Sequence, residues 1–162
     1  MCDNEKSNET SAKMDIRHAK PDEAAQLTQI AFAAKRYWGY PEAYISLWQN
    51  DLTISPEFIE KNNVFVFIQM DRIMGFCALS KGGSVRELEH FWIDPKYIGK
   101  GIGRELFRHV RETLKAVKAE KLRIVADPNA LGFYKKMGAK QIGDVASTPP
   151  GRLLPLLEYQ IY

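Results

Sequence analysis

Residues 95–104 of this 162-residue chain read PKYIGKGIGR. Glycines occur at alternate positions, Gly99, Gly101 and Gly103, immediately before an amphipathic run of residues. Small residues between a strand and a helix allow several backbone N–H groups to face one anion, and the helix dipole adds positive potential at the same place. The stretch therefore predicts an anion-binding loop at a helix N-terminus, and a plain glycine-rich turn without a ligand is the alternative.

Two common glycine-rich nucleotide loops do not fit this spacing. A P-loop has Gly-x-x-x-x-Gly-Lys followed by Ser or Thr, whereas Gly99-Lys100 is followed by another glycine and preceded, five positions earlier, by Asp94. A dinucleotide-binding fingerprint, Gly-x-Gly-x-x-Gly, needs a glycine where the chain has Arg104 or Leu106. Both motifs are excluded.

The rest of the chain alternates between strand and helix patterns around this loop. Alternating or continuous apolar residues predict strands at residues 14–18, 64–70, 73–80, 86–94, 122–126, 141–146 and 156–161. Apolar residues at helical spacing predict helices at residues 23–35, 56–61, 104–119 and 129–137, with another short one before residue 53. Asp71-Arg72 is predicted as a hairpin turn and Ser55 as a helix N-cap. An antiparallel meander followed by a strand–helix–strand unit predicts an α+β (mixed α/β) fold, a central mixed, mostly antiparallel sheet flanked by helices.

Strict alternation along the strand predicted at residues 86–94 indicates which side chains share a face. One face carries Glu87, Glu89, Phe91 and Ile93, and the other carries Leu88, His90 and Trp92. A carboxylate on the first face, close to the anion-binding loop, is placed to accept a proton, and a structural or solvated carboxylate is the alternative. His90 is interpreted as structural, and a pH-responsive role is the alternative.

Composition places the chain among ordinary globular proteins, with 45% hydrophobic and 27% charged residues. A net charge of +3 from scattered basic residues does not predict nucleic-acid binding. No apolar run is long enough to span a membrane, and MCDNEKSNETSAK lacks the apolar core of a signal peptide. We therefore expect a disordered tail over residues 1–13, a single domain over residues 14–162 and a cytoplasmic location. Cys2 and Cys77 form no CxxC pair, and three histidines without ligand spacing predict no metal site.

Two motifs resemble those of the GNAT superfamily of acetyl-CoA-dependent N-acetyltransferases. The family signature (Arg/Gln)-x-x-Gly-x-(Gly/Ala) is similar to residues 98–103, IGKGIG, in which Ile98 replaces the usual Arg or Gln. The family's Asn-x-x-Ala-x-x-Phe-Tyr is similar to residues 127–134, DPNALGFY, in which Asp127 replaces the Asn and Asn129 follows two positions later. The resemblance covers about residues 14–162 and implies the GNAT-like N-acyltransferase fold.

The resemblance also implies a reaction, the direct transfer of acetyl from acetyl-CoA, the co-substrate, to a primary amine. It implies Tyr134 as the general acid that protonates the coenzyme A sulfur. The general base implied on the preceding strand is Glu89 or Glu87, of which Glu89 lies nearer the loop. Contacts with the co-substrate are implied for the strand end, the loop and the second motif, at Trp92, Ile93, Ile98, Gly99, Lys100, Gly101, Ile102, Gly103, Arg104, Asn129 and Phe133.

The acceptor is left open between a small-molecule amine and a protein amine. Trp38–Pro41 lies where the family's variable acceptor-binding helices occur, and core packing is the alternative. Pro149–Arg152 is interpreted as an ordinary turn, and a loop that borders the acceptor site is the alternative. Members are often homodimers, so the resemblance also allows one here. Two other functions remain as alternatives, an acetyl-CoA-binding module or sensor without turnover and a protein that binds ATP with the glycine loop.

Overall fold

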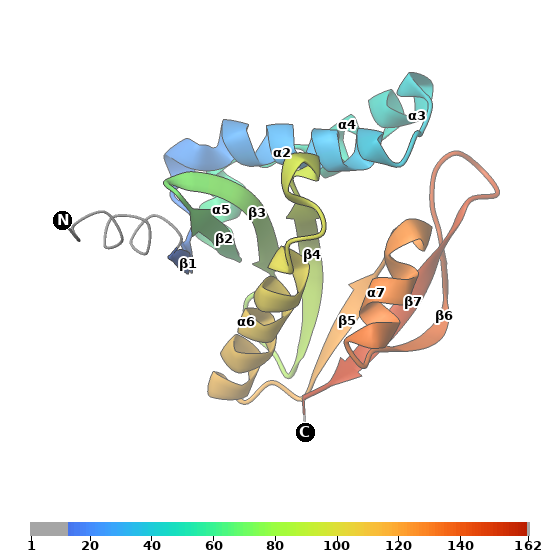
Figure 1. Cartoon of the computed structure of the whole chain (residues 1–162). Coiled ribbons are helices and arrows are strands. Elements are labelled where there is room, and N and C mark those ends of the chain that lie inside the picture. The colour runs from blue at the N-terminus through green and yellow to red at the C-terminus, as the bar shows by residue number, and fades with distance from the viewer. Residues whose placement is uncertain (1–12, 162) are drawn as a thin grey trace.

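The computed structural model of the chain describes residues 13–161. Of the tail predicted at residues 1–13, all but Lys13 lies outside these residues. The described strands form one sheet in the order β1-β2-β3-β4-β5-β7-β6 (Figure 1). Their bounds are β1 (Met14–His18), β2 (Asn63–Gln69), β3 (Arg72–Leu79), β4 (Val85–Ile93), β5 (Lys121–Val125), β6 (Lys140–Ala146) and β7 (Leu153–Gln160). Only β4 and β5 pair in parallel, which confirms the predicted mixed, mostly antiparallel sheet.

Helices cover both faces of the sheet. One face is covered by α2 (Ala24–Tyr37), α3 (Glu42–Leu47), α4 (Gln49–Leu52) and α5 (Pro56–Lys61), with the short 3₁₀ turn η1 (Pro21–Glu23) before them. The other face carries α6 (Ile102–Ala116) and α7 (Leu131–Lys136), preceded by the 3₁₀ turns η2 (Pro95–Tyr97) and η3 (Pro128–Ala130). Each face has its own core of buried side chains, which makes a three-layer domain. Within the described residues, no helix combines the length and apolarity needed to cross a membrane.

Local sequence explains most element ends. Ser55 caps α5 as predicted, because its Oγ accepts a hydrogen bond from the Phe58 amide at 3.0 Å. The β2–β3 turn is centred on Met70 and Asp71, one residue earlier than predicted. Both residues have positive φ angles of 55° and 57°. Two positive φ angles are typical of a type I′ turn, whose twist matches that of the flanking strands.

The side-chain alternation predicted along β4 is wrong at Glu89. Strand β3 pairs at successive positions with Leu88 and with His90, so Glu89 is the extra residue of a β-bulge. Leu88 therefore packs with Phe91 in the core beneath α6, whereas strict alternation had placed them on opposite faces. Glu87, one residue before Leu88, consequently does not share a face with Phe91. One inserted residue reverses the facing of every position on one side of it.

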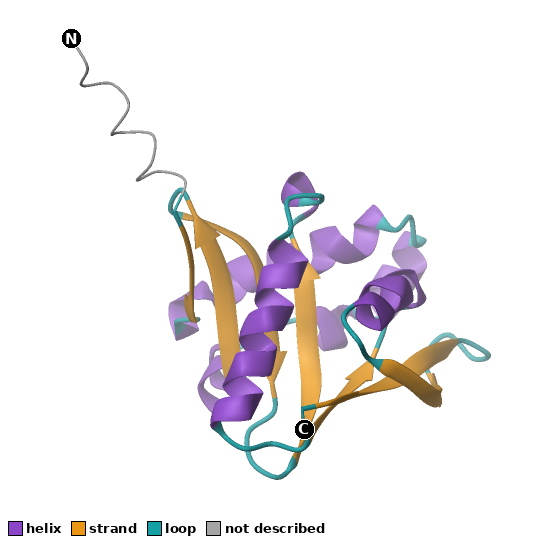
Figure 2. Ribbon diagram, turned by 60° about the horizontal axis from the view of Figure 1, so that its bottom comes forward, coloured by secondary structure: helices purple, strands orange, loops and turns teal. Residues whose placement is uncertain are grey.

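Strands β4 and β5 separate just after this bulge. They pair over four positions, Val85–Leu88 with Lys121–Ile124. Along Glu89–Ile93, β4 has β3 on one side and no strand on the other. Figure 2 shows the two strands diverging toward the N-terminal end of α6. The sheet is therefore split into a half that contains β1–β4 and a half that contains β5–β7.

Candidate active site

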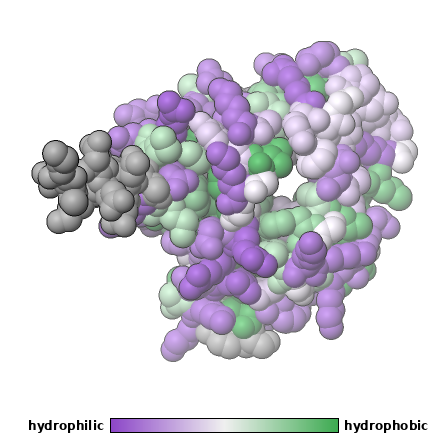
Figure 3. All heavy atoms as spheres, in the orientation of Figure 1, coloured by the Kyte–Doolittle hydropathy of each residue, from purple (hydrophilic) through white to green (hydrophobic). Residues whose placement is uncertain are grey.

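The split between β4 and β5 contains a cavity of about 320 Å³. Figure 3 shows the molecule hollowed between the two halves of the sheet, with hydrophobic atoms along the border. The lining is contributed by the C-terminal end of α2, by β4, by the loop after it, by the segment after β5 and by α7. Six aromatic side chains line it, Tyr37, Trp38, Phe91, Trp92, Phe133 and Tyr134. A concave, mostly apolar site with a few polar groups is typical of small-molecule binding.

The glycine loop lies at one end of this cavity, where Ile98 and Gly103 line it. Gly99 and Gly101 have φ angles of 84° and 78°, a left-handed conformation that favours glycine. At Gly103 a Cβ atom would lie 3.2 Å from the Phe133 ring, so this glycine allows close packing. The first two glycines thus shape the loop, and the third brings α6 against α7.

The loop presents unpaired amides. The first hydrogen bond of α6 runs from the Glu105 amide to the Gly101 carbonyl at 3.2 Å. Within the part of the chain that the structure describes, the amides of residues 99–104 find no acceptor. The Lys100 and Arg104 side chains are exposed beside them. Consecutive free amides at a helix N-terminus are an arrangement that suits an anion.

The structure brings most of the predicted site residues to the cavity. Its lining includes Glu89, Trp92, Ile93, Ile98, Gly103, Asn129, Phe133 and Tyr134. The Ile102 side chain is instead buried in the core beneath α6, so only its backbone faces the loop. Glu87 does not line the cavity, and its carboxylate lies 3.7 Å from the Arg123 guanidinium.

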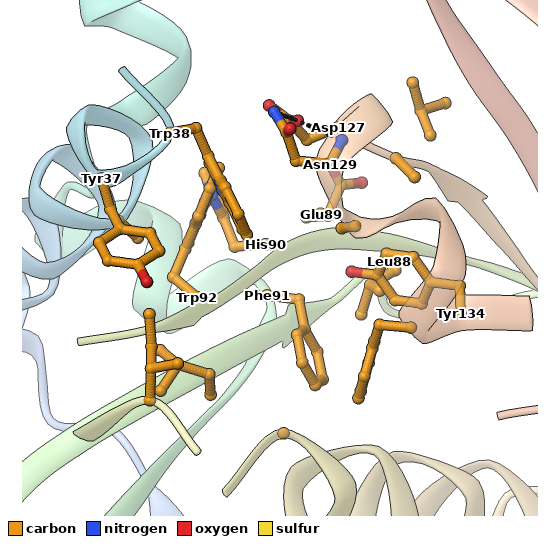
Figure 4. Close-up of a pocket in the computed structure, with 18 residues that line it drawn as sticks. Tyr37, Trp38, Leu88, Glu89, His90, Phe91, Trp92, Asp127, Asn129 and Tyr134 are labelled. Carbon is orange, nitrogen blue, oxygen red and sulfur yellow. Dashed lines mark hydrogen bonds between the residues drawn. The ribbon is translucent and has the colours of Figure 1, made fainter. Parts of the chain in front are cut away.

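Tyr134 is a buried tyrosine that lines the cavity. It is 5% exposed and packs against the rings of Phe91 and Phe133 at centroid distances of 5.9 Å and 5.3 Å. Its hydroxyl makes no hydrogen bond with any other described residue, and the side chain points into the cavity (Figure 4). Burial raises the pKa of Tyr134 above its usual value, so the hydroxyl keeps its proton at neutral pH.

Glu89 lines the cavity, and its carboxylate has no cation or hydrogen-bond donor beside it among the described residues. The bulge turns Glu89 toward the split. Partial burial, followed by the charge of Glu87, raises the pKa of Glu89. A carboxylate with a raised pKa is a stronger base, so Glu89 suits proton abstraction at neutral pH.

A buried ion pair closes the cavity on the side of α2. Lys35 Nζ lies 2.6 Å from Asp127 Oδ2, and the two side chains are 9% and 7% exposed. Sequence reasoning missed this pair. Lys35 lies four residues after Ala31 and eight after Leu27, so the helical spacing places it on the buried face of α2. A lysine at such a position needs a buried acidic partner, and this was the signal in the sequence. The partner is 92 residues away and follows only from the fold.

His90 is a neutral histidine in the wall of the cavity. Its Nδ1 accepts a hydrogen bond from the Trp92 indole at 3.0 Å, and burial lowers its pKa from 6.5 to about 4. Burial disfavours the protonated form of His90 in the folded state, whereas in the unfolded state His90 takes up a proton below about pH 6.5. The contribution of neutral His90 to the free energy of unfolding is therefore fully present above pH 6.5 and is lost as the pH falls toward 4.

We therefore expect His90 to lower the free energy of unfolding by about 3 kcal/mol between pH 7 and pH 4. Urea unfolding of wild type and His90→Gln over this range measures the difference between their slopes. The variant is expected to be less sensitive to acid, since titrations elsewhere are common to both proteins. Equal slopes would contradict this role of His90.

Comparisons with known proteins agree with this architecture. A family model described as an acetyltransferase (GNAT) domain matches residues 42–148. Among curated proteins no sequence matches the chain. Solved structures with the same fold include PaiA N-acetyltransferase from Thermoplasma acidophilum in complex with coenzyme A, with a TM-score of 0.77 and 19% identity over 91% of this chain and 99% of that one.

Two further structures show the same arrangement at similar identity. A GCN5-related N-acetyltransferase from Rhodopseudomonas palustris has a TM-score of 0.75 and 18% identity, covering 93% of this chain and 97% of that one. The ribosomal-protein-S18-alanine N-acetyltransferase of Escherichia coli has a TM-score of 0.70 and 15% identity, with coverage of 92% and 94%. At these identities the structural similarity concerns the fold.

Proposed function

Because the chain belongs to the GNAT acetyltransferase family, whose domain matches residues 42–148, we propose that it transfers acetyl from acetyl-CoA directly to a primary amine. The protein is an acetyl-CoA-dependent N-acetyltransferase. One observation supports the proposed route above all others. A single cavity joins an unpaired strand edge, a loop of free amides, a buried proton donor and an unpaired carboxylate.

The binding groups in this cavity fit coenzyme A. The free amides of residues 99–104 suit a pyrophosphate, and the exposed Lys100 and Arg104 add positive charge. The unpaired edge of β4 over Glu89–Ile93 offers backbone groups to an extended chain of amides such as pantetheine. Ile98, which replaces the usual polar residue, lines the cavity with its apolar side chain, and the amides do not depend on it.

The reacting groups fit a direct transfer. Glu89 accepts the proton of the attacking amine, and Tyr134 donates a proton to the departing sulfur. A backbone N–H on the free edge of β4 stabilises the negative oxygen that forms on the acetyl carbon. Cys77 takes no part as a nucleophile, because it is fully buried and burial raises its pKa to about 12.

The test is thiol release from acetyl-CoA with a panel of primary amines, followed by mass spectrometry of each amine. We expect at least one amine to gain an acetyl group in step with thiol release. Binding of acetyl-CoA without acetylation of any amine would contradict the proposal and support a sensor. Calorimetry that shows ATP bound more tightly than acetyl-CoA would support a nucleotide-binding protein instead.

The glycine loop provides a second prediction. Gly101→Ala forces an alanine into a left-handed conformation with φ of 78°, which costs about 1–2 kcal/mol. Because that strain distorts the amides that bind the anion, KM for acetyl-CoA is expected to rise about tenfold. Gly82→Ala is the matched control, since Gly82 has φ of 81° and open space around its Cβ position in a loop that does not line the cavity. An equal rise in KM for both variants would refute this role of the loop.

A further inference from the structure

The two halves of the split sheet carry different parts of the reaction. Glu89 belongs to β4 and thus to the first half, together with the glycine loop. Tyr134 belongs to α7, which packs on the second half. Beyond the four paired positions at Val85–Leu88, no sheet hydrogen bond joins the halves in the described chain. The distance between base and acid therefore depends on contacts outside the sheet.

Those contacts are of two kinds. Aromatic packing on the face of α6 and α7 places Phe91 and Phe107 of the first half against the Phe133 and Tyr134 rings. The polar contacts lie on the side of α2, where residues 35–48 meet residues 127–152. Lys35 Nζ lies 2.6 Å from Asp127 Oδ2, and the Tyr40 hydroxyl donates to the same oxygen at 3.0 Å. The Trp48 indole donates to the Thr148 carbonyl at 2.9 Å. Each of these bonds joins a segment packed on β1–β4 to a segment that follows β5. Figure 4 shows Asp127 and Asn129 above the cavity, opposite Trp92.

The Asp127 side chain is buried, and several directed hydrogen bonds and a second cation fix the position of its carboxylate. The backbone amide and the side-chain amide of Asn129 both donate to Asp127 Oδ1 at 2.9 Å. The Lys35 ammonium lies 4.5 Å from the centre of the Trp48 ring, and Arg152 lies 3.7 Å from Asp127. Although burial acts to raise the pKa of Asp127, the hydrogen bond from Lys35 holds it below its usual range. Burial lowers the pKa of Lys35, and the hydrogen bond to Asp127 acts in the opposite direction. Removing Asp127 leaves the Lys35 amine buried without its carboxylate, whereas removing Lys35 leaves Asp127 with the more distant Arg152.

We propose that the Lys35–Asp127 ion pair is a clamp that fixes the separation of the two halves of the split sheet, and that Lys35 is thereby a positioning residue for acetyl transfer. The kinetic consequence rests on the proposed function, whereas the structural consequence does not.

The clamp predicts an unequal effect on kinetic constants. Lys35→Met separates base from acid, and a displacement of this kind lowers kcat by about 30-fold. The glycine loop and the β4 edge both lie on the first half, so KM for acetyl-CoA is expected to change less than about threefold. Lys35→Arg, which retains charge and donors, is expected to recover most of kcat. Arg36→Met is the matched control, because Arg36 forms an exposed pair with Glu42, and it is expected to match wild type.

A second variant and a distance measurement keep the test independent of turnover. Asp127→Asn removes the other charge with little change of shape, and the double variant with Lys35→Met is expected to be no slower than either single variant.

Spin labels at Arg108→Cys on α6 and Lys135→Cys on α7, two exposed positions, report the separation of the halves. This requires Cys2→Ser, whereas Cys77 is fully buried.

We expect one narrow distance distribution for the labelled parent and for Arg36→Met, and a broader or shifted one for Lys35→Met and Asp127→Asn. Unchanged distances in both clamp variants would overturn the proposal, as would equal changes in kcat for Lys35→Met and Arg36→Met. A changed distance in a protein that acetylates no amine would support the clamp and reject the proposed function. If Lys35→Met does not fold, the same distances and rates in Asp127→Asn decide the outcome.

Discussion

Replacing Tyr134 with phenylalanine is expected to lower kcat about 100-fold, with KM for acetyl-CoA within about twofold of wild type. The reason is the position of one hydroxyl. Tyr134 is 5% exposed, its ring packs against Phe91, Phe107 and Phe133, and its hydroxyl faces the cavity without a partner among the described residues. Phenylalanine keeps the ring contacts and removes only the proton that the leaving sulfur needs. Steady-state thiol release with saturating amine measures the effect.

Tyr159→Phe is the matched control for this change. Tyr159 packs on the same core, with its ring 5.3 Å from that of Phe107, but it does not line the cavity. Both substitutions remove a hydroxyl from a tyrosine whose ring packs on this core, so thermal unfolding is expected to shift little in either protein while only Tyr134→Phe loses turnover. Wild-type kcat in Tyr134→Phe with every accepted amine would show that the general acid lies elsewhere.

The parts of the site that follow from local sequence were predictable. The loop at residues 99–104 was identified because alternate glycines before an amphipathic helix indicate a tight turn that exposes backbone amides. The structure shows the left-handed conformations at Gly99 and Gly101 and the free amides that such a turn requires. The mixed, mostly antiparallel sheet was predictable because a meander followed by a strand–helix–strand unit leaves few sheet arrangements. Tyr134 came from the resemblance of one short segment, residues 127–134, to a family motif.

The parts that depend on distant segments were not predictable. A β-bulge at Glu89 leaves no local signature, because it arises from how β3 pairs with β4, and it decides which glutamate enters the cavity. The Lys35–Asp127 ion pair joins residues 92 positions apart. A lysine on the buried face of a helix indicates that a partner exists but not which residue it is.

Glu89→Gln is expected to lower kcat/KM for the amine about 100-fold at pH 7, the loss of one general base. Glutamine keeps the size of the side chain at the bulge and removes its ability to accept a proton. The deficit is expected to shrink as the pH rises toward the pKa of the amine, because the free amine then needs no base. A purely structural role for Glu89 would give a deficit that does not depend on pH, so the pH profile of kcat/KM separates the two.

Glu87→Gln completes this experiment, because the bulge sends the two glutamates to different surroundings. Glu87 lies outside the cavity, 3.7 Å from Arg123, and its charge contributes to the raised pKa of Glu89. Activity of Glu87→Gln at pH 7 is therefore expected to stay within about twofold of wild type, while the acidic limb of its pH profile moves to lower pH. The direction follows from the sign of the interaction, since removing a neighbouring negative charge makes Glu89 easier to ionise. A large loss at pH 7 in Glu87→Gln with normal activity in Glu89→Gln would assign the base to Glu87 instead.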